Sequence, residues 1–308
     1  MSNSSVLFDA PGPKSRRASL ISSIIAGILI IAGLAWMAWT LAQPRESGGI
    51  TLPGFFDPSR WDIFADPEVW QYIFFEGVLG TLKAALVASV FAIALGVVFS
   101  LLRSAQAAWI RVPTTVILEF LRGMPVLLMM LFILLALNTG SYWAVVAALS
   151  LYNGALIGEA LRAGLAALPR GQREAGLSLG MRPLQSKMLV EFPQAFRQML
   201  PIIVAQLVVL LKDTSLGYIV GYTELLRTNM NVLGSFYGNR YLFSLFVVTL
   251  VLYLIMNLSL SWFARWLSKR TASKSSGTRL DPEDPNQAML VAQATATARQ
   301  SETQHGSI

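Results

Sequence analysis

Two adjacent ionisable residues, Lys212 and Asp213, interrupt a stretch of the chain that is otherwise apolar. Charged groups inside a hydrophobic span are costly, and they usually line a solute pathway or pair with a neighbouring helix. Because consecutive residues of a helix point about 100° apart, the two side chains cannot share one face. We expect Lys212 to meet a carboxylate of a polar solute and Asp213 an ammonium group. The alternative is that both bond to neighbouring helices.

Three uncharged polar residues extend this candidate pathway. Thr214 and Ser215 directly follow the charged pair, and Asn153 is a lone polar group in an earlier apolar run. Each could hydrogen-bond a polar solute. The hydroxyl groups of Thr214 and Ser215 could instead bond the carbonyl one turn back, which we favour for single Ser and Thr residues in helices. Asn153 could equally join two helices.

Two acid–base pairs stand near the ends of apolar runs. Glu119 precedes Arg122 by three residues, and Glu159 precedes Arg162 by the same interval. This spacing lets the members of each pair meet on one face of a helix. We interpret both pairs as structural salt bridges at a gate, and contact with a solute is the alternative.

The composition argues against enzymatic, metal and nucleic-acid functions. The chain has no cysteine and one histidine, His305 in a polar tail, so neither a metal site nor a catalytic histidine is expected. The sequence also lacks the G-x-x-x-x-G-K-[ST] phosphate loop. Only 13% of the residues are charged, against about 25% in soluble domains. The net charge of +7 therefore indicates a membrane protein, not a nucleic-acid partner, and we predict no cofactor.

Six apolar segments are long enough to cross a bilayer as helices, which takes about 20 residues. The charge-free run from residue 123 to 158 exceeds one span, and the turn-forming residues 138–141 divide it. The predicted spans are Leu20–Leu41, Gly77–Leu102, Val116–Leu137, Tyr142–Ala163, Met199–Tyr222 and Tyr241–Ala264.

The distribution of Lys and Arg predicts the orientation of these spans. Basic residues concentrate at the N-terminus, after spans two and four, and after span six. Cytoplasmic loops carry such an excess, so we expect a multi-pass cell-membrane protein with both termini in the cytoplasm. A cleaved signal peptide is the alternative for span one, although its apolar run is longer than a usual signal sequence. The predicted units are a cytoplasmic segment 1–19, an added helix 20–41, an external interfacial segment 42–76, a core domain 77–266 and a disordered tail 267–308.

A charged loop, residues 168–198, connects spans four and five. Residues 170–179 favour a short helix, Gly180 should bend the chain, and Pro183 suits the first turn of a second helix. We expect the second helix to end at Phe192–Pro193, because the residue before a proline avoids the α conformation. The loop could pack beneath the membrane domain, bind a partner protein or rest on anionic lipid.

This segment resembles the EAA loop of importer-type ABC permeases, whose pattern is E-A-A, three residues, G, nine residues, then I-x-L-P. The chain keeps the pattern at Glu174, Ala175, Gly180 and Pro193. It departs at Gly176, Val190 and Phe192, and Gly176 should weaken the first helix by up to about 1 kcal/mol relative to alanine. Five blocks in order resemble signatures of the polar amino-acid permeases, within a resemblance over about residues 77–265: 119–125, 159–164, 171–175, 193–195 and 212–216.

The resemblance implies an all-α membrane protein with six transmembrane helices: a five-helix importer-type ABC permease core and one extra N-terminal helix. It implies that the loop is a coupling element that docks on a separate ATPase. The residues assigned to this coupling are Gly171, Gln172, Glu174, Ala175, Gly176, Gly180 and Pro193. Glu174 is expected to contact the ATPase through a charge-assisted bond, and a helix pair with Arg170 is the alternative.

The resemblance also implies the partners. These are an ABC ATPase dimer, a second homologous permease, an extracellular solute-binding protein, an amino-acid substrate and membrane lipid. Residues 6–13 and the extra first span are most similar to a glutamate permease, which favours glutamate as the cargo and a heterodimer over a homodimer. Two other functions stay open: an ion-gradient-driven secondary transporter or channel that uses Lys212 and Asp213 as ion sites, and a membrane scaffold without transport.

Overall fold

The computed structural model describes residues 13–47 and 50–272 of the chain. Among them, five helical segments are long and apolar enough to cross a membrane, and each overlaps a predicted span. They are Ser15–Ala42, Pro67–Arg103, Ser141–Ala166, Pro183–Tyr218 and Asn239–Leu267. The expectations for residues 1–12 and 273–308 lie outside the described part. Residues 267–272, which we expected in the tail, continue the last helix.

The predicted third span is not one helix. It consists of α4 (Ala108–Gly123) and α5 (Val126–Leu137), which are bent by 103° relative to each other and complete a sixth span if counted together. Between them Met124 has an extended backbone, with ψ of 129°, because it precedes Pro125 and is kept out of the α region. Asn138 in the left-handed conformation ends α5, at the turn expected between spans three and four.

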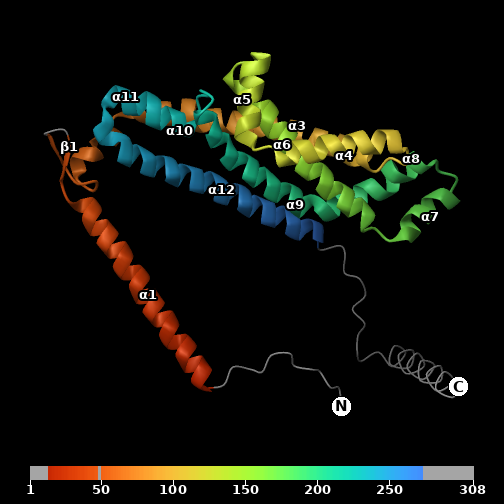
Figure 1. Cartoon of the computed structure of the whole chain (residues 1–308), viewed down its shortest axis with the longest axis horizontal. Helices are drawn as coiled ribbons and strands as arrows, with labels where there is room; N and C mark the ends of the chain where they lie inside the picture. Colours follow the sequence, from red (N-terminus) through yellow and green to blue (C-terminus); the bar gives the residue numbers. More distant parts are fainter. Residues whose placement is uncertain (1–12, 48–49, 273–308) are drawn as a thin grey trace.

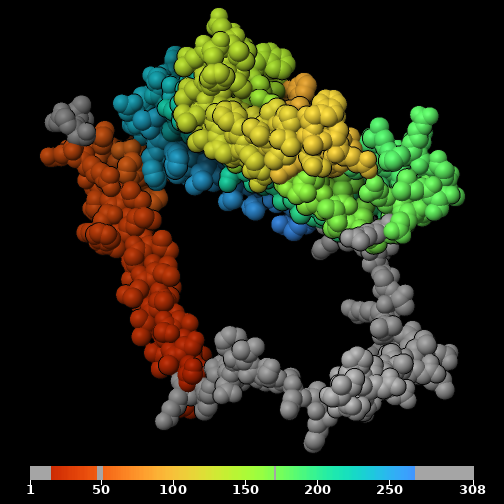
Figure 2. All heavy atoms as spheres, turned by 45° about the vertical axis from the view of Figure 1, so that its right-hand side comes forward, coloured from red at the N-terminus to blue at the C-terminus, as the bar shows by residue number. Residues whose placement is uncertain are grey.

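The long helices are α1 (Pro13–Ala42), α3 (Leu79–Arg103), α6 (Ser141–Ala166), α9 (Phe192–Asp213) and α12 (Leu242–Ala272). Figure 1 shows the last four gathered in one elongated bundle, and α5 projecting from its side. Helix α1 leaves the bundle at one end as a separate arm, as the turned view of Figure 2 also shows. Its apolar side chains are largely exposed, as expected of a helix surrounded by lipid.

Small residues bring α3 and α6 into close contact at the centre of the bundle. A Cβ atom added to Gly154 would lie 2.9 Å from the Cβ of Leu95, and one added to Gly158 would lie 2.9 Å from the Cβ of Phe99. Gly96 of α3 would similarly collide with Ile157. These glycines therefore allow close helix packing, as in the small-residue interfaces of other membrane helices.

One end of the bundle, where residues 45–78 and 225–241 lie, is covered by a folded cap (Figure 1). Its elements before α3 are β1 (Arg45–Ser47), which pairs antiparallel with β2 (Ile50–Leu52), η1 (Pro58–Arg60), η2 (Asp62–Ala65), α2 (Pro67–Gln71) and π-helical η3 (Tyr72–Val78). Those before α12 are α10 (Leu225–Arg227), η6 (Thr228–Leu233), α11 (Gly234–Tyr237) and η7 (Asn239–Tyr241).

Several polar contacts join the two halves of this cap. The guanidinium group of Arg60 donates to the carbonyl oxygens of Pro53 and Arg240, each at 3.0 Å. Tyr237 donates its hydroxyl to Asp66 at 2.8 Å, and this hydrogen bond raises the pKa of the Tyr237 phenol. The small sheet and these contacts make the cap a folded addition to an otherwise helical protein.

Candidate functional site: the loop between α6 and α9

The loop between α6 and α9 contains the two short helices that the sequence predicts. They are α7 (Arg170–Ser178) and α8 (Pro183–Ser186), and they form one end of the molecule in Figure 1. Gly180 between them has a φ of +79°, a left-handed conformation that glycine adopts without steric cost. The prediction that Gly180 bends the chain is therefore confirmed.

A close contact and a hydrogen bond hold the loop together. Gly176 is buried against α8, where an added Cβ atom would lie 2.5 Å from the Oγ of Ser186. On the neighbouring turn, Gln194 of α9 donates its amide to the side-chain oxygen of Gln172 at 3.0 Å. The departure from alanine at 176 therefore has a structural reason, and α7 is fastened to both of the helices that follow it.

The second helix does not end at Phe192–Pro193, so that expectation is wrong. Residues Lys187–Glu191 form the π-helical segment η4, and α9 starts directly at Phe192, whose φ and ψ are −62° and −46°. Pro193 stands in the first turn of α9, where its missing N–H removes no regular hydrogen bond. The loop therefore continues into span five without a break.

The face of α7 that carries the EAA-like residues is open to solvent. Gly171, Glu174 and Ala175 are exposed, and the Glu174 side chain has no ion-pair partner among the side chains that the structure describes. The side chain of Arg170, its expected alternative partner, is outside that set. An exposed carboxylate on a short helix at the end of the molecule can bind a basic group of another protein.

Arg103 joins the two predicted gate pairs into one network. The predicted contacts are present: Arg122 reaches Glu119 at 3.5 Å, and Arg162 reaches Glu159 at 2.7 Å. Arg103, at the end of α3, contacts Glu119 of α4 at 3.3 Å and also bonds Glu159 of α6. Sequence reasoning used Arg103 only to orient the spans, because its partners lie 16 and 56 residues away.

The candidate pathway residues lie at the end of α9 and not deep within it. The α-helix ends at Asp213, and Thr214–Tyr218 form the 3-10 helix η5. Lys212 is exposed and Asp213 half-buried, and neither side chain forms an ion pair or hydrogen bond with the residues described. Thr214 and Ser215 donate to the carbonyls of Leu211 and Lys212, at 2.7 and 2.8 Å, so the backbone alternative holds for both hydroxyls.

Asn153 forms the helix–helix contact that we weighed against a pathway role. It is fully buried in α6, donates to the carbonyl of Leu149 at 2.8 Å, and accepts the amide of Gln206 from α9 at 2.8 Å. Both of its polar atoms thus have partners inside the bundle. The side chain joins α6 to α9.

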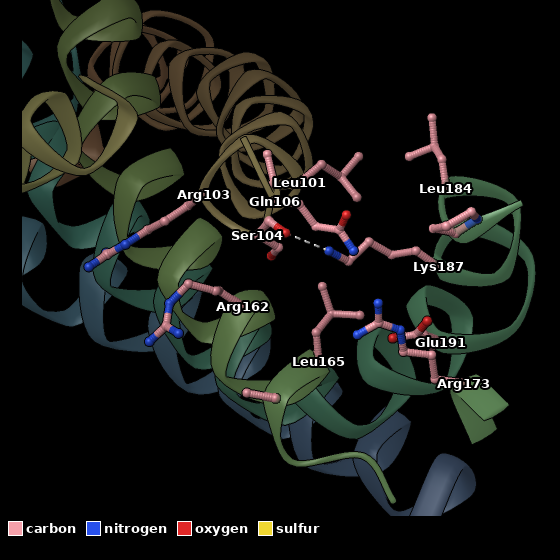
Figure 3. Close-up of a pocket in the computed structure, with 13 residues that line it drawn as sticks. Leu101, Arg103, Ser104, Gln106, Arg162, Leu165, Arg173, Leu184, Lys187 and Glu191 are labelled. Atoms are coloured by element: carbon pink, nitrogen blue, oxygen red, sulfur yellow. Dashed lines mark hydrogen bonds between the residues drawn. The ribbon is translucent and has the colours of Figure 1, made fainter. Parts of the chain in front are cut away.

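A cleft of about 460 Å³ separates the loop from the ends of α3 and α6. Figure 3 shows Lys187 reaching across it toward α3, where its ammonium donates to the carbonyl oxygen of Ser104 at 2.9 Å. Arg173 and Glu191 enter the cleft from the loop side, while the head groups of Arg103 and Arg162 turn to the opposite side. In the sequence, Lys187 served only as one of the basic residues that orient the spans, because a lysine in a charged loop offers no signal of its partner.

The family of this protein follows from its match to a known family of transport proteins. Residues 92–273 match the family described as "Binding-protein-dependent transport system inner membrane component". The chain belongs to this family. Such inner-membrane components are multi-pass transport proteins and not enzymes, and the ATPase and the substrate-binding protein of these systems are separate subunits.

Individual relatives of this inner-membrane component agree with the family assignment. It is 34% identical to the glutamate transport system permease protein GluD of Corynebacterium glutamicum, over 77% of this chain and 89% of that protein. It is 32% identical to the probable glutamine ABC transporter permease protein GlnP of Bacillus subtilis, over 63% and 92% of the two chains. A crystal structure of an amino acid ABC transporter with histidines superposes with a TM-score of 0.59 at 26% identity, over 66% of this chain and 95% of that one.

Proposed function

We propose that this inner-membrane component is the permease subunit of an ABC importer for a polar amino acid. The observation that carries the proposal is the exposed α7–Gly180–α8 unit between α6 and α9. In this proposal α7 docks on a separate ATPase and transmits its closure to the membrane helices. Glu174 supplies the charged contact, and Gly180 sets the angle between the two helices of the loop.

The proposed assembly follows because residues 13–47 and 50–272, which the structure describes, contain one such loop. An ATPase dimer offers two docking positions, so two permeases pair above it. The resemblance to glutamate permeases favours a second, homologous permease over a second copy of this chain. An external solute-binding protein delivers the amino acid to the cap, and both termini face the cytoplasm, where the Lys and Arg residues concentrate.

Glutamate is the proposed cargo. The names of the relatives, which are glutamate and glutamine permeases, support it. Lys212 and Asp213 are the proposed cargo contacts, because both carry charge in the last turn of α9 and neither has a partner among the described side chains. A free ammonium and a free carboxylate together complement the opposite charges of an amino acid.

The network around Arg103 is proposed as the cytoplasmic gate. It joins the ends of α3, α4 and α6 through Glu119 and Glu159, so these helix ends can separate only if ion pairs break. Arg122 and Arg162 each add a second base to one of the two acids. An acid-to-base network that is only partly exposed holds the helix ends together yet remains able to rearrange.

Co-purification and uptake measurements test the proposed function. An ATPase subunit should co-purify with the tagged chain. Glu174→Ala should abolish uptake and Gly180→Ala should lower it, while both variants still reach the membrane. Uptake that is unchanged in both variants would remove the coupling role from the loop. An ion-gradient transporter would instead take up cargo in ATP-free liposomes that contain this chain alone.

A further inference from the structure

Lys187 joins the loop to the end of α3 across an otherwise open cleft. Its ammonium lies 2.9 Å from the carbonyl oxygen of Ser104, and Figure 3 shows the side chain spanning the space between them. Within the described residues, no other hydrogen bond connects loop residues 170–191 to α3. The cleft of about 460 Å³ around this bond leaves few other contacts through which the loop could act on α3.

On the loop side, Lys187 belongs to a unit whose helices are packed against and hydrogen-bonded to one another. It directly follows Ser186, which lies against Gly176 of α7 at a distance that admits no side chain at position 176. Gln172 of α7 is also bonded to Gln194 of α9. A displacement of α7 therefore displaces Lys187 with it.

On the membrane side, Ser104 is fastened to the last turn of α3. Its backbone N–H donates to the carbonyl of Ser100 at 3.1 Å, and its hydroxyl donates to the same oxygen at 2.5 Å. The preceding residue is Arg103, which binds Glu119 of α4 and Glu159 of α6. A pull on the carbonyl of Ser104 thus acts on the residue that holds three helix ends together.

We infer that Lys187 is a positioning residue that transmits the movement of α7 to the Arg103 network. The inference rests on the proposed coupling role of the loop and adds the link by which the loop acts on the gate. When the ATPase moves α7, Lys187 pulls the end of α3 and shifts Arg103 between Glu119 and Glu159. Contacts that merely lie between two sites do not establish coupling. The hydrogen bond between Lys187 and Ser104 therefore has to be removed and then replaced by another connection.

The first experiment cuts the link in the complete transporter, reconstituted with its ATPase and binding protein. Lys187→Met should leave subunit assembly and basal ATP hydrolysis intact, yet lower both uptake and the stimulation of ATP hydrolysis by loaded binding protein by about tenfold or more. This is the factor expected for losing one charge-assisted hydrogen bond from the coupled state. Lys187→Arg keeps a donor at this position and should retain coupling.

A matched control removes the same charge from the same side of the membrane. Arg111 of α4 is exposed, and its side chain has no hydrogen bond or ion pair within the described part of the chain. Arg111→Met should couple like the wild type. If Lys187→Met also couples like the wild type while the wild type shows ATP-driven uptake, the inference fails and the proposed function stands. If the wild-type complex shows no ATP-driven uptake, the proposed function itself fails.

The second experiment restores the link by chemistry. Because the natural sequence has no cysteine, Ser104→Cys combined with Lys187→Cys gives two unique thiols. Before linking, the double variant should resemble Lys187→Met. A short bifunctional thiol reagent should then restore stimulated ATP hydrolysis and uptake, whereas coupling that stays lost after complete linking would overturn the inference.

Discussion

Gly176 of α7 lies directly against Ser186 of α8: a Cβ atom at position 176 would lie 2.5 Å from the Oγ of Ser186 and 3.1 Å from its Cβ. The glycine thus allows the two helices of the loop to touch. The family pattern has alanine at this position, so the residue that looked like a weakness of the first helix is the one that the packing of this loop requires.

Gly176→Ala should therefore destabilise the loop, although alanine is the better helix former. Overpacking of this kind costs about 1–3 kcal/mol, which should appear as faster protease cleavage within residues 170–191 of the purified protein. Gly171→Ala is the matched control, because no atom lies within 4 Å of the added Cβ. Adding Ser186→Gly to Gly176→Ala should restore protection, and equal cleavage of the two alanine variants would contradict the packing argument.

Gly180→Ala should reduce uptake through backbone strain. The φ of Gly180 is +79°, and a side chain in the left-handed conformation costs about 1–2 kcal/mol. Gly180→Asn should be milder, because asparagine adopts this conformation more readily than alanine. Uptake per molecule in the membrane should therefore be highest for the wild type, lower for Gly180→Asn and lowest for Gly180→Ala. Equal uptake by the two variants would contradict the proposal that Gly180 fixes the bend.

Arg103→Gln should destabilise the purified protein more than Arg122→Gln. Arg103 is 16% exposed and joins α3 to two other helices, whereas Arg122 is twice as exposed and meets Glu119 within its own helix. Removing one partner from a buried pair costs about 3–5 kcal/mol, and the partial exposure at this site reduces the expected loss to about 1–3 kcal/mol. The loss for Arg122→Gln should be below about 1 kcal/mol. Thermal unfolding in detergent measures the loss of stability in both variants. Equal losses would contradict the conclusion that Arg103 joins the three helix ends.

Asn153→Ala should lower stability and leave the cargo concentration for half-maximal uptake unchanged. The substitution deprives the Gln206 amide of its acceptor at 2.8 Å, and such interhelical bonds contribute about 1–2 kcal/mol. A double-mutant cycle with Gln206→Ala should show that the two effects are not additive. If stability stayed constant while the half-maximal concentration rose, Asn153 would belong to the pathway.

The sequence predicted those features that depend only on neighbouring residues in the chain. Uninterrupted apolar runs located the spans, and the positive φ at Gly180 follows from a glycine between two helical patterns. The sequence also held two signals that we did not use. Gly123-Met124-Pro125 marks the bend between α4 and α5, and the dipeptide Gly48-Gly49 in the sequence is of a type that favours a hairpin.

Other features depend on contacts between distant residues, and these were beyond sequence reasoning. Arg103 meets Glu159 across 56 positions, and Lys187 meets Ser104 across 83; no spacing rule connects such residues. At Phe192–Pro193 a correct local rule gave the wrong result. The rule assumes that the residue before a proline cannot be helical. Here the π-helical segment η4 precedes Phe192, and Pro193 lies in the first turn of α9, so Phe192 is helical.

Photo-cross-linking in membranes that contain the complete transporter tests whether α7 seats on an ATPase. A photoreactive residue replaces Glu174 in one variant and the exposed Glu68 of the cap helix α2 in another. The proposed coupling predicts an ATPase adduct from position 174 and none from position 68. Adducts of position 174 with lipid alone, or equal ATPase adducts from both positions, would contradict it.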